Sequence, residues 1–319
     1  MRGPQSREEW IETAGLAVAA GALYASGFFA LLFLLPLVAL LRRRGFSALL
    51  VGAGIAVLGV IIVDVVRLSR LPSGPGLPWL VAWNWTLPVG LLVGLVVLGW
   101  PIPGVQRTLY RLLVGWAATM VVTVPLYVKI GADGTLHAFL ESQFAALGAA
   151  TEGGDAAQSG AALLADTAVR VLGNTYGVGL LVLLVLNWYL GSYLAHRFST
   201  GVAPPPRLAG FAMPSQAVWV LIASVAAVLL TFLADLGPVE PVAWNVALVS
   251  LFLYGVQGIA VGRHLLAHYR VQQGARMLII IGAIVLVFVP GVNLIVLLGL
   301  PGLGVSELWI DYNRFERRR

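Results

Sequence analysis

The chain has 319 residues, of which 59% are hydrophobic and only 11% are charged, whereas soluble domains have about 25% charged residues. This composition, with a mean hydropathy of +0.91, excludes a soluble globular protein and predicts a polytopic membrane protein. The net charge of +6 comes from basic residues at the ends of apolar runs, so we expect contact with the lipid bilayer and no nucleic-acid partner.

The first apolar run covers residues 11–41. As one helix it would be about 46 Å long, against about 30 Å for the hydrocarbon core of a bilayer. We expect Ala25, Ser26 and Gly27 to turn the run into a hairpin of two short helices, with Pro36 kinking the second one. The alternative is a single, strongly tilted helix.

Further apolar runs predict the remaining membrane helices. They cover residues 46–66, 77–100, 109–130, 169–194, 218–236, 242–264 and 277–300. The last run contains Pro290 and Gly291, which favour a second hairpin. We therefore predict an all-α transmembrane helical bundle of about 8–10 membrane helices, with short hairpins at both ends. It would form a single integral membrane domain over residues 1–319.

The basic residues predict the orientation of the bundle. Arginine is dense at residues 42–44, 263–276 and 314–319, whereas the connection at 131–166 carries no Lys or Arg. Dense basic loops lie on the cytoplasmic side of a membrane. We therefore expect a multi-pass membrane protein with both ends in the cytoplasm, and residues 303–319 forming a cytoplasmic basic tail.

Residues 131–168 predict an extracytoplasmic loop with a short amphipathic helix. Apolar residues from Leu136 to Leu147 recur at helical spacing, and Asp133 is placed to cap the helix. This helix would lie on the membrane surface. It would act either as a lid over an outward-facing pocket or as a spacer followed by a flexible segment at residues 151–160.

Polar side chains inside the apolar runs predict a polar interior. Ser250, Tyr254 and Gln257 share one face of the helix expected at residues 242–264, and Asn245 lies on a different face. An unpaired amide in hydrocarbon costs several kcal/mol, so these groups should face protein rather than lipid.

Two more amides lie deep within other apolar runs. The residues that we predict to bind a ligand or to bridge helices are Asn84, Asn187, Asn245, Tyr254 and Gln257. Three charged residues lie near helix ends, and we expect all of them to reach the membrane interface instead: Asp64, Lys129 and Asp235.

Small residues recur along the first helix. They are Gly15, Ala17, Ala19, Gly21 and Ala25. Small side chains let helix backbones approach closely in lipid, where association depends on packing. This pattern predicts either packing within the bundle or a docking face for another membrane subunit.

Enzymatic patterns are missing from the sequence. No hydrolase, nucleotide-binding or zinc-protease motif occurs, and the absence of cysteine excludes thiolate metal sites. His264 and His268 have a spacing that could hold a metal, but Arg263 and Arg270 flank them and favour an interfacial basic patch. We therefore expect no enzyme, no cofactor and no metal site.

An ordered set of short motifs, densest after residue 187, resembles the YybS-like family of predicted bacterial inner-membrane proteins. The motifs are Asn187 before a basic turn, Phe211-x-x-Pro214 leading to Trp219, Asn245 with Tyr254-x-x-Gln257-Gly258, Leu298-Gly299-Leu300, and Trp309-x-Asp311-Tyr312 before Arg314, together with residues 33–36 and 42–45 near the start. The motifs near the start also resemble, more loosely, the substrate-binding S components of energy-coupling-factor transporters.

The family resemblance implies no settled activity, whereas the transporter resemblance implies a bundle that binds a small molecule and docks on a transmembrane partner. Two hypotheses follow: a small-solute-binding or transport-complex subunit with an unknown ligand, or a non-transporting scaffold or assembly partner for other membrane proteins. A solute pocket requires a cavity that touches several of the predicted polar residues. A scaffold can bury the same residues in hydrogen bonds between helices.

Overall fold

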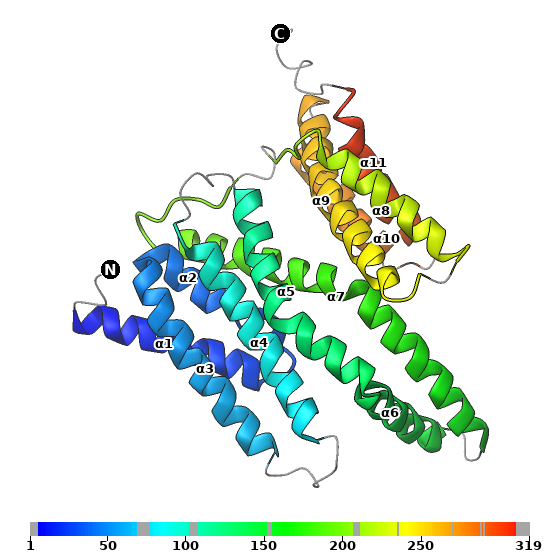
Figure 1. Ribbon diagram of the computed structural model, residues 1–319. Coiled ribbons are helices and arrows are strands. Elements are labelled where there is room, and N and C mark those ends of the chain that lie inside the picture. The colour runs from blue at the N-terminus through cyan, green and yellow to red at the C-terminus, as the bar shows by residue number, and fades with distance from the viewer. Residues whose placement is uncertain are drawn as a thin grey trace. The chain divides into compact units, whose positions relative to one another are not determined.

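The computed structural model describes residues 6–68, 77–101, 108–151, 155–206, 211–234, 236–269, 271–287, 289 and 291–310. Within these ranges the chain forms eleven α-helices and a short 3-10 helix, with no strand (Figure 1). The helices long and apolar enough to cross a membrane are Phe46–Arg67, Thr108–Ala132, Gly160–Arg197 and Val239–Leu266. The predicted all-α membrane bundle is confirmed.

The helices gather in two compact units. Unit 1 comprises Met1–Gly173 and Gly179–Pro205, and unit 2 comprises Asn174–Val178 and Pro206–Arg319. Each unit has its own buried residues, and each is described separately below.

The chain of unit 1 begins with the predicted hairpin. Helix α1 (Arg7–Ala25) is followed by a turn at Gly27, whose φ of +71° favours glycine, and by the 3-10 helix η1 (Ala30–Leu32). Helix α2 (Leu35–Arg44) then returns along α1. Pro36 lies in the first turn of α2, where no helical hydrogen bond is lost, so the predicted kink at this residue is wrong.

Three longer helices pack beside the hairpin. Helix α3 (Phe46–Leu68) lies on α1, and helix α4 (Leu77–Gly99) lies on helix α5 (Thr108–Ala132). The α4–α5 crossing is close, because a Cβ on Gly115 would lie 2.7 Å from the carbonyl oxygen of Gly94. Glycine at both positions allows the two backbones to meet.

The connection after α5 is itself helical. Helix α6 (Thr135–Thr151) coincides with the predicted amphipathic helix, and it buries Leu136 while Leu147 is exposed. Helix α7 (Asp155–Arg197) begins inside the segment expected to be flexible. The spacer hypothesis, one of the two alternatives, gave this segment as flexible, but from residue 155 onward the alanine-rich sequence continues as helix. Residues 152–154 lie outside the described residues.

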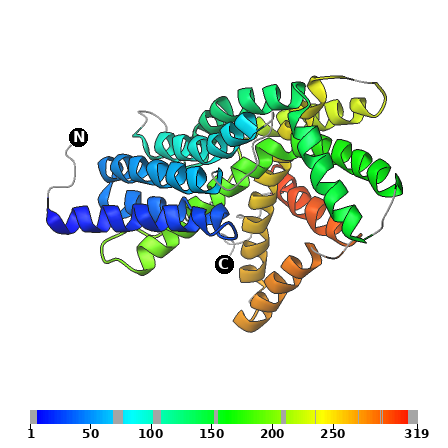
Figure 2. The same cartoon turned by 90° about the horizontal axis from the view of Figure 1, so that it is seen from below.

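Helix α9 (Val239–His268) is the centre of unit 2, with helices α8 (Ala217–Thr231) and α11 (Asn293–Ser306) packed on it. Helix α10 (Gln273–Val287) and α11 form the second predicted hairpin, and Gly291 in the turn has a φ of +83°. Figure 2 shows α10 leaving the end of α9 and the chain turning back as α11. Helices α8, α10 and α11 are each about 22 Å long, shorter than a bilayer core.

Candidate functional site

The polar face of α9 points into unit 2. Tyr254 is fully buried, Gln257 is only 2% exposed, and Ser250 is also buried. The prediction that this face meets protein is confirmed. No membrane-facing position is compatible with the burial of these three side chains.

Gln257 joins three segments of unit 2. Its side-chain oxygen accepts a hydrogen bond from the backbone N–H of Met213 at 3.0 Å, in the segment before α8. Its Nε2 donates to the Glu307 carboxylate at 2.7 Å, at the end of α11. The α9–α11 crossing beside it is tight, since a Cβ on Gly258 would overlap the carbonyl oxygen of Leu300. Gln257 therefore acts as a clamp between helices.

Tyr254 lies one turn before Gln257 on the same buried face. Its hydroxyl oxygen is buried and has no hydrogen-bond partner among the described residues. Its backbone carbonyl lies against Gly304 of α11, where a Cβ would overlap it. The side chain thus fills the α9–α11 contact but leaves one polar atom unsatisfied, which is uncommon in a native interior.

Asn245 makes its hydrogen bonds at the other end of α9. Its Oδ1 accepts a hydrogen bond from the backbone N–H of Gly177 at 2.6 Å, and its Nδ2 donates to the Pro241 carbonyl at 2.7 Å. Gly177 lies within α7, which bends midway along its length (Figure 1). Asn245 and Gln257 are separated by about 18 Å along the helix, so they do not share one pocket.

Asn187 bridges two segments of unit 1. Its side chain is 1% exposed, and its Nδ2 donates to the carbonyls of Leu31 in η1 and Leu183 in α7, both at 2.8 Å. Its Oδ1 is buried without a partner among the described residues. The amide therefore ties α7 to the N-terminal hairpin.

Asn84 takes part in a polar network that spans three helices of unit 1. Its Nδ2 donates to the Tyr24 hydroxyl at 3.0 Å, and that hydroxyl donates to Asp64 Oδ2 at 3.0 Å. Arg67 lies 3.8 Å from Asp64 Oδ1 and donates to the Ala25 carbonyl at 2.7 Å. We call Tyr24, Asp64, Arg67 and Asn84 the Tyr24 network.

The Tyr24 network corrects one expectation. Asp64 is 2% exposed, so the prediction that it reaches the membrane interface is wrong. The N-terminal hairpin brings Tyr24 against α3 and gives the carboxylate a partner inside the bundle. Only the Asp64–Arg67 spacing was visible in the sequence, because Tyr24 comes from a distant helix. Lys129 is exposed, and Asp235 lies outside the described residues.

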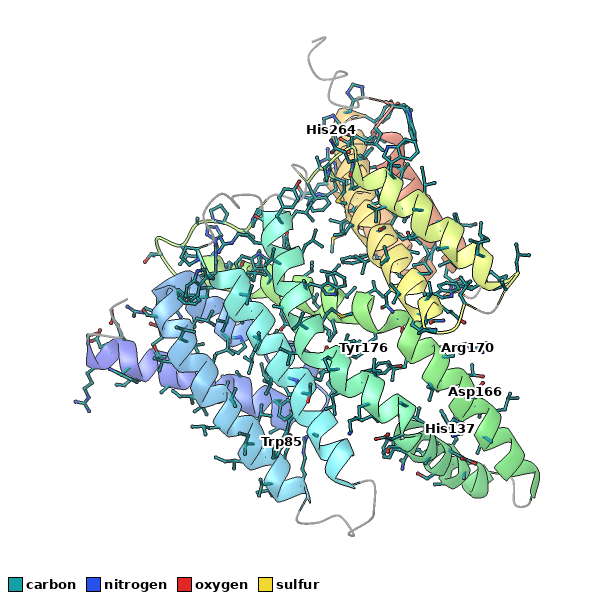
Figure 3. All side chains as sticks on the ribbon, viewed as in Figure 1. Trp85, His137, Asp166, Arg170, Tyr176 and His264 are labelled. Atoms are coloured by element: carbon teal, nitrogen blue, oxygen red, sulfur yellow. The ribbon has the colours of Figure 1, made fainter. Side chains whose placement is uncertain are left out.

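The indole of Trp85 lies next to Asn84 in the sequence, on α4 (Figure 3). Its Nε1 is buried and has no hydrogen-bond partner among the described residues. Trp85 was not among the predicted site residues. The sequence held no signal for it, because the burial of an indole nitrogen depends on packing that forms only in the folded protein.

The small residues of α1 fall into two groups. Ala17 is 1% exposed, and Gly21 packs against Gly59 of α3, so both belong to the internal α1–α3 contact. Gly15 and Ala25 are exposed, and Ala19 is half-buried. Part of the predicted docking face is therefore already occupied within unit 1.

Comparison with known proteins places the chain in a family. A family model described as "Predicted membrane protein (DUF2232)" matches residues 16–301. The chain belongs to this family. The DUF2232 match is consistent with the resemblance to the YybS-like proteins, and it supports residence in a lipid bilayer. No curated protein and no solved structure matches the chain significantly. The looser similarity to energy-coupling-factor S components stays a prediction.

Proposed function

We propose that this DUF2232 protein is a non-enzymatic scaffold or assembly partner for other proteins of the bacterial inner membrane. One observation carries the proposal. Each of the four amides predicted to bind a ligand makes a hydrogen bond to a different segment of its own unit. The bonds join Asn84 to Tyr24, Asn187 to Leu31, Asn245 to Gly177, and Gln257 to both Met213 and Glu307.

These hydrogen bonds favour the scaffold over a solute site built from the same residues. A solute site presents free donors and acceptors to a cavity, whereas here each amide is engaged with protein through at least one of its two polar atoms, and Asn187 Oδ1 alone is buried without a partner among the described residues. A groove in unit 2 lies between α9 and α10, and none of the five predicted residues lines it. The polar residues thus serve to fix the helices, which a scaffold needs.

A scaffold also needs an uncovered face for a partner, and α1 offers one. Exposed residues recur at steps of four and three along it, namely Ile11, Gly15, Val18, Ala22 and Ala25. None of these five residues has a polar side chain, and three of them are glycine or alanine. Such a face fits a helix of another membrane protein at close range.

The docking face can be tested by photocrosslinking in native membranes. A photoreactive amino acid at Val18, which is 63% exposed on α1, should capture a defined membrane protein. The matched control is Ile62, which is 64% exposed but belongs to α3 and not to α1. Capture of the same protein from both positions, or of lipid alone from Val18, would contradict docking through α1.

A second candidate function is a small-solute-binding subunit of a transport complex. The observation that favours it is the buried Tyr254 hydroxyl, which has no hydrogen-bond partner among the described residues. A solute could form a hydrogen bond with this hydroxyl. The variant Tyr254→Phe separates the two candidates. Removing an unsatisfied hydroxyl should leave a scaffold as stable or more stable, whereas a solute-binding subunit should lose the solute that co-purifies with it.

A further inference from the structure

A groove of about 750 Å³ lies between the last turns of α9 and the first turns of α10. Pockets that hold small molecules have volumes of about 300–1,000 Å³. Among the lining residues, those that carry the argument are Ile259 and Arg263 of α9, and Gln273, Arg276, Met277 and Ile281 of α10. His264 marks this end of α9 in Figure 3.

The two arginines line the end of the groove beside the turn, together with Leu266 and Met277, and two isoleucines line it farther along the helices. The chain turns between His268, where α9 ends, and Gln273, where α10 begins. Arg263 and Arg276 lie within about 8 Å of these helix ends, whereas Ile259 and Ile281 lie about 12–14 Å from them. Both guanidinium groups therefore lie beside the turn, next to apolar side chains, and the groove continues as an apolar surface farther along the helices.

The guanidinium groups of Arg263 and Arg276 are available to bind an anion. Arg276 is held in place by a hydrogen bond from its Nε to the Val271 carbonyl at 2.8 Å, which leaves its terminal nitrogens available. Among the described residues, the ion pairs involve neither Arg263 nor Arg276. Two guanidinium groups beside an apolar wall favour an anion with an apolar body, because arginine matches phosphate geometry and the wall excludes water.

We propose that this groove binds an anionic phospholipid of the surrounding bilayer. The phosphate would lie between Arg263 and Arg276 with Gln273 as a further donor, and an acyl chain would lie along Ile259 and Ile281. The segment from Arg263 to Arg276 is the dense basic segment of the C-terminal half, so the lipid belongs to the cytoplasmic leaflet. Basic pockets between membrane helices on that side commonly hold anionic headgroups. This site does not depend on the scaffold function.

The test measures lipid binding to the delipidated full-length protein in detergent micelles by native mass spectrometry. Phosphatidylglycerol should bind in a stoichiometric amount, and phosphatidylcholine should bind much more weakly. The double variant Arg263→Gln with Arg276→Gln should weaken phosphatidylglycerol binding about 25-fold, because each arginine charge contributes about fivefold to the affinity. Arg197→Gln, which removes an exposed arginine at the end of α7, should have no effect.

A second variant tests the apolar wall while keeping both arginines. Ile281→Trp should fill the groove and reduce phosphatidylglycerol binding without lowering the melting temperature, because Ile281 is 45% exposed. The comparison of phosphatidylglycerol with phosphatidylcholine, and the displacement of bound phosphatidylglycerol by other anions, use wild-type protein, so they remain decisive if a variant misfolds.

Four outcomes would overturn the assignment. An equal loss in Arg197→Gln would indicate general surface attraction, and equal binding of phosphatidylcholine would indicate an apolar groove without headgroup recognition. Displacement by millimolar inorganic phosphate alone would indicate an anion site without a lipid chain. Tighter binding of a polyprenyl phosphate than of phosphatidylglycerol would assign the groove to a carrier lipid instead of the bilayer.

Discussion

A buried amide stabilises a membrane protein only while its oxygen and its nitrogen both keep partners. Gln257 meets this condition with Met213 and Glu307, which lie on either side of it in the sequence. Both polar atoms of the Gln257 amide are therefore occupied by hydrogen bonds within unit 2, and neither is left to bind a solute.

The first prediction concerns this clamp. The variant Gln257→Leu should lower the free energy of unfolding by about 2–3 kcal/mol, because it removes two hydrogen bonds and leaves a carboxylate without its partner. Thermal unfolding in detergent micelles measures the loss. The control is Gln216→Leu, at the exposed N-cap of α8, where the side chain makes no capping hydrogen bond. Equal losses in both variants would contradict the clamp.

The second prediction concerns the Tyr24 network. The variant Tyr24→Phe should lower the free energy of unfolding by about 1–2 kcal/mol, because the hydroxyl donates to Asp64 and accepts from Asn84. Tyr110→Phe is the matched control, since Tyr110 is 40% exposed on α5 of the same unit. The network would be in doubt if denaturation in detergent showed both variants to be as stable as the wild type.

At the scale of elements, two glycines of α9 differ in whether close helix packing requires them. A Cβ on Gly258 would overlap the carbonyl oxygen of Leu300, whereas a Cβ on Gly262 would lie 3.9 Å from the nearest side-chain atom, Leu303 Cδ2. The two residues look alike in the sequence, four positions apart on one helix. Only Gly258 is required by the α9–α11 crossing.

The third prediction uses this pair. Gly258→Ala should cost about 1–3 kcal/mol, because the new methyl group forces α9 and α11 apart. Gly262→Ala should leave the protein equally or more stable, because alanine favours helix and the space is open. Melting temperatures of the two variants in one detergent provide the comparison. A larger loss for Gly262→Ala would show that the crossing is misplaced.

The helices themselves were largely predictable. The hairpin at residues 11–41 followed from length, since one straight helix would overshoot the bilayer core, and Gly27 and Gly291 occupy turns with positive φ. The start of α7 was missed because glycine and polar residues at 151–160 are typical of a connection. Local sequence there could not show that the alanines after Asp155 extend the helix.

The site was predictable only in part. The periodicity of α9 was sufficient to place Tyr254 and Gln257 on a buried face. It could not supply their partners, because Met213 and Glu307 come from segments that approach α9 only after folding. The burial of Asp64 was missed for the same reason. A carboxylate near a helix end has an easy route to water unless a distant residue such as Tyr24 is placed against it.

At the scale of the whole molecule, the fourth prediction concerns topology in the membrane. The chain contains no cysteine, so single cysteines can be introduced without a background signal. Ser142→Cys, at an exposed position of α6 that follows the ion pair of Glu141 with His137 (His137 is labelled in Figure 3), should react with an impermeant maleimide in intact cells. Glu8→Cys and Trp309→Cys should react only after the membrane is permeabilised.

The topology experiment has a clear contrary result. Labelling of Glu8→Cys or Trp309→Cys in intact cells would place that end outside and would exclude a re-entrant hairpin beside it. Both positions are exposed, so a lack of reaction after permeabilisation would indicate burial in the membrane and would also contradict cytoplasmic ends.

The account rests on buried amides that hold helices together and bind no solute. Native mass spectrometry of the full-length protein, released gently from its own membranes, tests this claim most directly when wild type and Gln257→Leu are compared. We expect phospholipid and partner proteins in the wild-type spectrum and no polar solute in a stoichiometric amount. A stoichiometric polar solute that is present with the wild type and absent with Gln257→Leu would contradict the claim.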